Sequence, residues 1–240
     1  MSEKIQEANN SDLVKFNNYI EQKKPLEIIE WAYRTFKNNF AFTTSFGIQS
    51  AVLLHIIQNS NLKNKVKIFW IDTGYLPKET YKYAEDIINK LSLNIEVLQS
   101  ELSPARMEAL YGKLWESNKS ADLDKYHKIR KINPLEKAFK QYSISCWASG
   151  VRAQQTKNRS KMKVIDVIRN RYSLRPLLTW STKDMFYYME EYDLPQHPMF
   201  LKGYSTIGDW HSSQPETEEI QGRDTRFGGI KAECGLHTND

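Results

Sequence analysis

The chain has 240 residues, of which 40% are hydrophobic and 26% are charged, and its formal net charge is +5. This composition excludes a disordered chain and predicts one globular domain with a sizeable core. No apolar run approaches the ~20 residues that cross a bilayer, and the polar N-terminus is unlike a signal peptide, so a cytoplasmic protein is expected. The positive charge favours anionic ligands, and without an arginine-rich arm or a lysine run nucleic acid is not indicated.

Hydrophobic periodicity predicts helices and strands that alternate along the chain. The expected helices lie at 13–22 with Asp12 as cap, at 25–37, after Gly47, at 79–91 and after the N-cap Ser181, with a helical stretch over 103–142 broken at Pro134. The expected strands are 40–46, 66–71, 94–98, 144–148 and 164–168. This order is typical of an α/β fold with a doubly wound, mostly parallel sheet. We expect N-terminal helices over 1–39, an α/β domain over 40–215 and a mobile C-terminal arm over 216–240.

The turn after the first expected strand is a candidate anion site. It consists of Ser45, Phe46, Gly47, Ile48 and Gln49. In a doubly wound sheet, ligands bind just beyond the carboxyl ends of the strands. The glycine allows the backbone to approach a ligand, and the free N–H groups of the following helix attract anions. A plain tight turn explains the same residues as well.

Two further strand ends carry polar residues. Asp72, Thr73 and Gly74 follow the second strand, where they suit a sugar hydroxyl or a base, although a capping Asp with a glycine turn is an equal alternative. Arg152 and Arg159 follow the strand at 144–148. A planar guanidinium group donates two parallel hydrogen bonds to phosphate or sulfate oxygens, so these arginines predict an anion site. A solvated basic loop is the alternative.

The two cysteines have contrasting surroundings. Cys146 lies in an apolar strand, which predicts a buried and inert thiol. Cys234 lies in a polar segment near Lys231 and His237, whose positive charge would lower the pKa of the thiol and favour the nucleophilic thiolate. A stray exposed cysteine is the alternative. Two cysteines without paired spacing do not supply the four thiolates that an iron–sulfur cluster normally takes.

Together these segments resemble the phosphoadenylyl-sulfate (PAPS) reductase family, over nearly the whole chain from about Pro25. The matching segments are 45–49, 71–75, 111–115, 131–135, 150–152 and 233–237, and the terminal Glu-Cys-Gly-Leu-His is the most specific of them. The resemblance implies a fold like the adenine-nucleotide α-hydrolases, with a modified pyrophosphate loop at 45–49. It also implies that 40–215 is the sulfonucleotide-binding domain.

The family resemblance further implies an activity, the thioredoxin-dependent reduction of PAPS to sulfite and adenosine 3′,5′-bisphosphate in assimilatory sulfate reduction. Cys234 would attack the sulfur and carry an S-sulfocysteine, supported by Lys231 and His237, until thioredoxin or glutaredoxin cleaves it. The implied substrate-binding residues are Ser45, Phe46, Gly47, Ile48, Gln49, Asp72, Thr73, Gly74, Lys131, Gly150, Arg152, Arg159, Arg223 and Arg226. A homodimer is expected, and no flavin, metal or iron–sulfur cluster.

Departures from related patterns bear on three alternatives. Relatives that reduce adenylyl sulfate with a cluster carry cysteines at the places of Tyr126, His127 and the region 209–212, so the resemblance implies that this chain holds no cluster. A cluster-free reductase that prefers adenylyl sulfate is the nearest enzyme alternative. ATP pyrophosphatases of this fold usually carry Ser-Gly-Gly-x-Asp-Ser in this loop. In this chain Phe46 and Gln49 replace the second and fifth of those residues, and the loss of the acidic side chain argues against ATP cleavage. A non-catalytic nucleotide-binding module would not need the terminal cysteine.

Two alanines also depart from the family. Ala232 stands where many relatives have arginine before Glu-Cys, which reduces the positive charge near the thiol. Ala153 stands where relatives have a second arginine after Gly-x-Arg.

Overall fold

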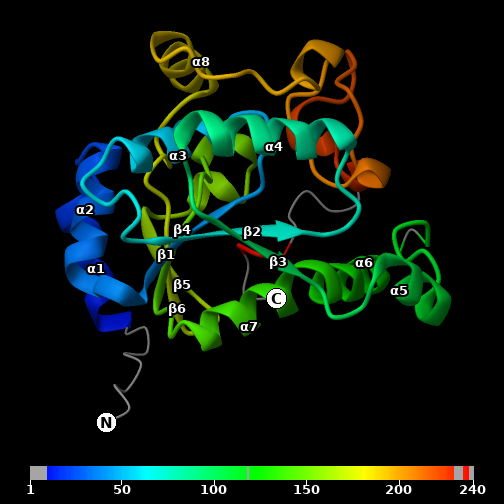
Figure 1. Cartoon of the computed structure of the whole chain (residues 1–240), viewed down its shortest axis with the longest axis horizontal. Coiled ribbons are helices and arrows are strands. Elements are labelled where there is room, and N and C mark those ends of the chain that lie inside the picture. The colour runs from blue at the N-terminus through cyan, green and yellow to red at the C-terminus, as the bar shows by residue number, and fades with distance from the viewer. Residues whose placement is uncertain (1–9, 118, 230–234, 238–240) are drawn as a thin grey trace.

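A six-stranded sheet forms the centre of the molecule. The computed structural model describes residues 10–117, 119–229 and 235–237 (Figure 1). The strands are β1 (Phe40–Thr44), β2 (Lys67–Asp72), β3 (Ile95–Gln99), β4 (Cys146–Ala148), β5 (Ile165–Ile168) and β6 (Arg171–Leu174). Their order is β3-β2-β1-β4-β6-β5, and every neighbouring pair is parallel except the β5–β6 hairpin. The expected doubly wound, mostly parallel sheet is confirmed.

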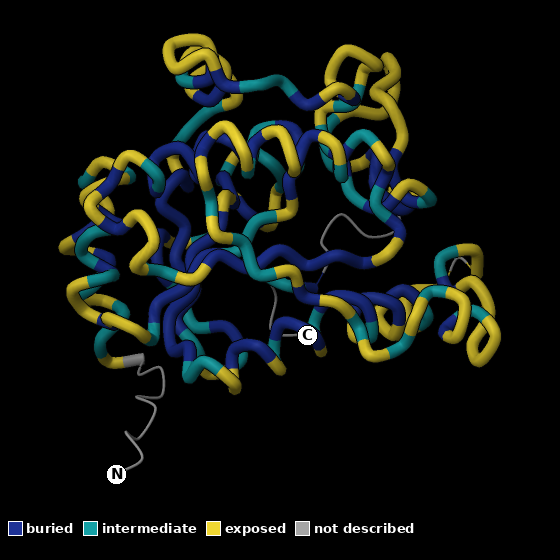
Figure 2. Tube along the Cα trace, viewed as in Figure 1, coloured by how far each residue is buried: buried dark blue, intermediate teal, exposed yellow. Residues whose placement is uncertain are grey.

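Helices cover both faces of this sheet, as Figure 1 shows. They are α1 (Asn10–Ile20), α2 (Pro25–Phe36), α3 (Ser50–Gln58), α4 (Lys78–Leu91), α5 (Pro104–Tyr111), α6 (Ser120–His127), α7 (Asn133–Gln141) and α8 (Thr182–Glu191). None of these helices, all within the described residues, is long and apolar enough to cross a membrane. The buried strands are dark blue in Figure 2, while the outer turns of the helices are exposed.

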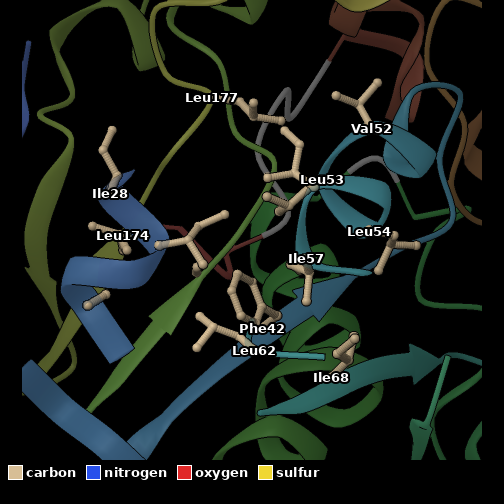
Figure 3. Close-up of a cluster of buried hydrophobic side chains, with 14 of the residues drawn as sticks. Ile28, Phe42, Val52, Leu53, Leu54, Ile57, Leu62, Ile68, Leu174 and Leu177 are labelled. Carbon is tan, nitrogen blue, oxygen red and sulfur yellow. The ribbon is translucent and has the colours of Figure 1, made fainter. Parts of the chain in front are cut away.

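Alternate side chains of the central strands pack into two hydrophobic layers, one on each face of the sheet. Phe42 and Ile68 belong to the larger layer, together with residues of α2 and α3 and with Leu174 (Figure 3). Ala41 and Phe69, the neighbours along the same strands, belong to the second layer, which α7 covers. Successive strand residues face opposite sides, so strands covered on both faces are apolar at nearly every position.

Of the N-terminal helices, α1 packs against the edge strand β5, and α2 packs against β1 and α3. Pro25 starts α2 as expected, whereas Asp12 lies within the first turn of α1 rather than before it. The Asn17 side chain donates to the Ile165 carbonyl at 2.8 Å and accepts from the Ile165 N–H at 3.2 Å. This side chain therefore covers backbone groups of the edge strand β5, which would otherwise be open to pairing with another strand.

The expected break at Pro134 is wrong. A π-helical turn, Lys128–Ile132, joins α6 to α7, and Pro134 lies in the first turn of α7. The wider π turn accommodates a residue that has no N–H to donate and whose ring would clash in a regular helix. The same turn buries Arg130 and Lys131, so a local departure from α geometry positions two cations beside the sheet.

Candidate active site

A cavity of about 230 Å³ opens at the carboxyl ends of the parallel strands. It lies where β1 meets both β2 and β4. The chain runs outward from β1 to β3 and then returns to β4 on the other side of β1, so this point is the topological switch of the sheet. In open α/β sheets the crevice at such a switch is the usual ligand site.

The loop after β1 forms one wall of the cavity. Its Phe46 ring is fully buried and meets Trp70 edge-to-face at 4.8 Å, with a left-handed φ of +45° that is rare for an aromatic residue. Phe46 therefore anchors the loop from behind and does not line the cavity. The N–H groups of Gly47, Ile48 and Gln49 bond to no acceptor among the described residues, which leaves them for an anion at the start of α3.

Five cationic side chains line the cavity, and among the described lining residues they face one carboxylate, that of Asp209. The cations are Lys131, Arg152, Arg159, Arg223 and Arg226. All except Arg223 are buried. Placing so much positive charge out of water is costly unless an anion binds there, so the lining favours a ligand with several negative charges.

Two glutamines organise Arg152 and Arg159. Gln49 Oε1 accepts from the Arg152 guanidinium, and Thr182 Oγ1 accepts from its other nitrogen at 3.2 Å. Gln155 Oε1 accepts from the Arg152 N–H at 3.0 Å and from the Arg159 guanidinium. Burial, together with the nearby charge of Arg159, lowers the pKa of Arg152 to about 10. Arg152 still carries its charge at neutral pH, and a bound anion would stabilise it.

Lys131 enters the cavity from the opposite side and is paired. Its Nζ lies 2.7 Å from Oδ2 of Asp209, which is fully buried and also accepts from the Thr73 hydroxyl. Burial alone would raise the pKa of Asp209, but Lys131 and the Thr73 hydroxyl outweigh it and hold the pKa below its usual range. Asp209 is therefore ionised. The sequence did not identify it as a site residue, because it lies in an irregular segment without periodicity.

Arg226 is held against the segment that carries Asp209. Its Nε donates to the Ser212 carbonyl at 3.1 Å, and its guanidinium lies on Gly208, where a Cβ would clash with it. The missing side chain of Gly208 thus makes room for this arginine in the cavity wall.

The described end of the chain reaches the same cavity. Arg169 donates to the carbonyls of Gly235 and Leu236 at 3.1 and 3.2 Å, and the His237 ring stacks on Trp147 at 5.1 Å. Burial, and after it the charges of nearby arginines, hold the pKa of His237 well below its usual value. His237 is therefore neutral at pH 7, and the positive charge that the sequence suggested for it is absent. Cys234 and Lys231 lie outside the described residues.

The phosphoadenosine phosphosulfate reductase domain model matches residues 39–215. The chain belongs to this family. It is 46% identical over 226 residues to phosphoadenosine 5′-phosphosulfate reductase of Synechococcus sp., covering 94% of this chain and 97% of the relative. It is 44% identical over 227 residues to the enzyme of that name from Synechocystis sp., covering 94% and 90%.

Solved structures confirm the adenine-nucleotide α-hydrolase-like fold. The crystal structure of phosphoadenylyl-sulfate reductase from Candida auris, a phosphate complex, has a TM-score of 0.73 and 25% identity, and the alignment covers 86% of this chain and 98% of that one. Candida glabrata FMN adenylyltransferase, with FAD and pyrophosphate, has a TM-score of 0.58 at 15% identity, covering 90% and 72%. This second likeness concerns the fold alone.

Most of the described residues expected in a reductase site line the cavity. These are Ser45, Gly47, Ile48, Gln49, Thr73, Lys131, Gly150, Arg152, Arg159, Arg223, Arg226 and His237. Besides Phe46, the exceptions are Asp72 and Gly74, which lie behind the wall. The Asp72 carboxylate accepts from the Gly74 N–H at 2.8 Å, from Tyr81 at 2.6 Å and from Gln99 at 2.8 Å. It therefore shapes the turn after β2, the alternative that the sequence left open.

Cys146 is fully buried in β4, as expected, and burial raises the pKa of its thiol well above the usual value. Of the residues that the family resemblance singled out for the absence of cluster cysteines, Tyr126 and His211 pack against aromatic rings. His211 stacks on Trp115 at 4.1 Å and makes a 3.0 Å hydrogen bond with the Tyr126 hydroxyl. Burial lowers the pKa of His211 to about 4, so this ring is neutral as well.

Proposed function

We propose that this chain reduces PAPS to sulfite and adenosine 3′,5′-bisphosphate in assimilatory sulfate reduction, using thioredoxin or glutaredoxin as the reductant. The observation that carries the proposal is the cavity at the switch of the sheet, where the described lining has five cations and one carboxylate. Membership of the reductase family and the phosphoadenosine 5′-phosphosulfate reductase names of its relatives support the choice of substrate.

The proposed role of the cavity is to position the phosphosulfate and neutralise its charge. The buried arginines Arg152, Arg159 and Arg226 offer paired N–H donors, and the loop at 47–49 offers backbone donors. Such preorganised donors act strongly because little water competes with them. The leaving group is a stable phosphate, so holding the sulfur in line with the nucleophile supplies much of the catalysis.

Cys234 is the proposed nucleophile. Its thiolate forms a bond to the sulfur of the substrate while the bond from that sulfur to the phosphate oxygen breaks, and the electron pair leaves with adenosine bisphosphate. A thiolate of the reductant then attacks Sγ of the S-sulfocysteine and releases sulfite, and its second thiol frees Cys234 as the reductant becomes a disulfide. Because His237 is neutral, we propose that the arginines of the cavity, with Lys231, lower the pKa of the thiol while His237 offers a hydrogen bond.

Sulfite release and peptide mass test this proposal. With PAPS and no reductant, the Cys234 peptide should gain the mass of one SO₃ group, and added thioredoxin should remove it with release of sulfite. Cys234→Ser should form no sulfite yet still bind adenosine bisphosphate. Adenylyl sulfate as a parallel substrate distinguishes a cluster-free adenylyl-sulfate reductase. Rapid sulfite release without reductant, or a label on another residue, would contradict the scheme.

A further inference from the structure

Two buried cations that line the cavity, Lys131 and Arg152, differ in the charge of the groups that bind them. Lys131 is neutralised by Asp209 at 2.7 Å. Arg152, on the other side, is held by neutral oxygens, the amide oxygen of Gln49 and the hydroxyl of Thr182. No carboxylate of the described residues forms an ion pair with Arg152. The positive charge of Arg152 is therefore oriented but not cancelled.

The carboxylate whose charge acts on Arg152, that of Asp184, is bound elsewhere. Its Oδ2 accepts from the N–H and from the hydroxyl of Ser181, both at 2.7 Å, as part of the capping box that starts α8. The cap keeps this charge at the helix terminus, while the first residue of the same helix, Thr182, bonds Arg152 through a neutral hydroxyl.

We infer that Gln49 is a positioning residue that holds the Arg152 guanidinium in the cavity through a neutral oxygen and so leaves its charge to the anionic substrate. This inference rests on the proposed function and deepens it. An acidic residue at position 49 would place a carboxylate against the guanidinium, and Arg152 would then pair within the protein. The amide makes the same hydrogen bond without that competition. Gln49 also lines the cavity, so direct contact with the substrate is the rival role.

A double-mutant cycle separates the two roles. Gln49→Leu, Arg152→Met and the double variant are compared with wild type by calorimetric binding of adenosine 3′,5′-bisphosphate and of inorganic phosphate. Arg152→Met should weaken bisphosphate binding about 10- to 100-fold, the worth of a charge-assisted contact. Gln49→Leu should weaken it about 3- to 10-fold by releasing the guanidinium. If Gln49 acts through Arg152, the double variant should bind within about twofold of Arg152→Met alone.

A charge variant with a matched control completes the test. Gln49→Glu should weaken bisphosphate binding at least about tenfold, leave the binding of uncharged adenosine within about twofold, and keep or raise the melting temperature through the new ion pair. Gln154→Glu makes the same charge change on an exposed side chain outside the cavity and should bind both ligands like wild type. General damage to the fold would instead lower stability and weaken both ligands together.

Two outcomes would overturn the inference. Losses that multiply in the double variant would mean that Gln49 contacts the ligand itself, and unchanged bisphosphate binding in Gln49→Glu would mean that the charge of Arg152 is not reserved for it. Failure of the proposed function looks different. Wild type would then bind phosphate but not adenosine bisphosphate. The affinities of the same variants for inorganic phosphate would still show whether Gln49 acts through Arg152.

Discussion

The buried ion pair between Lys131 and Asp209 allows a quantitative test of how much this contact in the cavity wall stabilises the fold. Asp209→Asn keeps the shape of the side chain but removes its charge, which leaves the ammonium of Lys131, a buried residue that is 8% exposed, without its counter-ion. Removing one partner of a buried pair costs about 3–5 kcal/mol. In a domain of this size each kcal/mol lowers the melting temperature by about 2–4 °C, so a fall of about 6–20 °C is expected.

Thermal and urea unfolding followed by circular dichroism measure this loss. Glu101→Gln is the matched control, because Glu101 and Lys137 are also 2.7 Å apart but exposed, and its melting temperature should match that of wild type. The pKa of Asp209 is lowered in the folded protein, so the pair stabilises fully above the unfolded value near 4 and is lost as pH falls below it. The difference between wild type and Asp209→Asn should therefore persist from pH 7 to about 5. A loss below about 1 kcal/mol at pH 7 would refute this account of the pair.

Three further predictions concern the thiols, a buried histidine and iron. Cys146→Ala should keep most of the sulfite-forming activity, since the Cys146 thiol is buried in β4, and a folded but inactive variant would contradict a mechanism through Cys234 alone. The pKa of His197 is lowered by burial to about 4, so its protonation destabilises the fold as pH falls from the unfolded value near 6.5 toward 4. Between pH 7 and 5, wild type should lose about 2 kcal/mol more stability in urea unfolding than His197→Gln, and equal losses would contradict the neutral assignment. Iron analysis and visible spectra should find a colourless protein that chelators do not inactivate, because two cysteines cannot supply four thiolates, whereas stoichiometric iron lost together with activity would overturn this expectation.

Local patterns in the sequence were enough to predict most of the central sheet. β1 and β2 contain short apolar runs, and β3 mixes apolar residues with Glu96 and Gln99; these local signals need no knowledge of distant residues. Strand β6 was not predicted, because its hairpin turn uses Arg169 and Asn170 with left-handed φ angles of +47° and +60° in place of a glycine. The break expected at Pro134 was wrong, because the helical path continues from the π turn at 128–132 into α7, whose first turn contains Pro134.

At the site, the residue types that stand at the strand ends, among them Arg152, Arg159 and the loop at 45–49, could be read from the sequence. What each side chain does there depends on contacts that form only in the folded chain. Asp72 and Asp209 are both acidic residues next to turns. The carboxylate of Asp72 accepts hydrogen bonds from its own turn, from α4 and from β3, whereas that of Asp209 neutralises Lys131 from a distant segment. This is so because the role of a buried charge depends on which groups surround it. Those groups come from elements far apart in the chain, which only folding brings together.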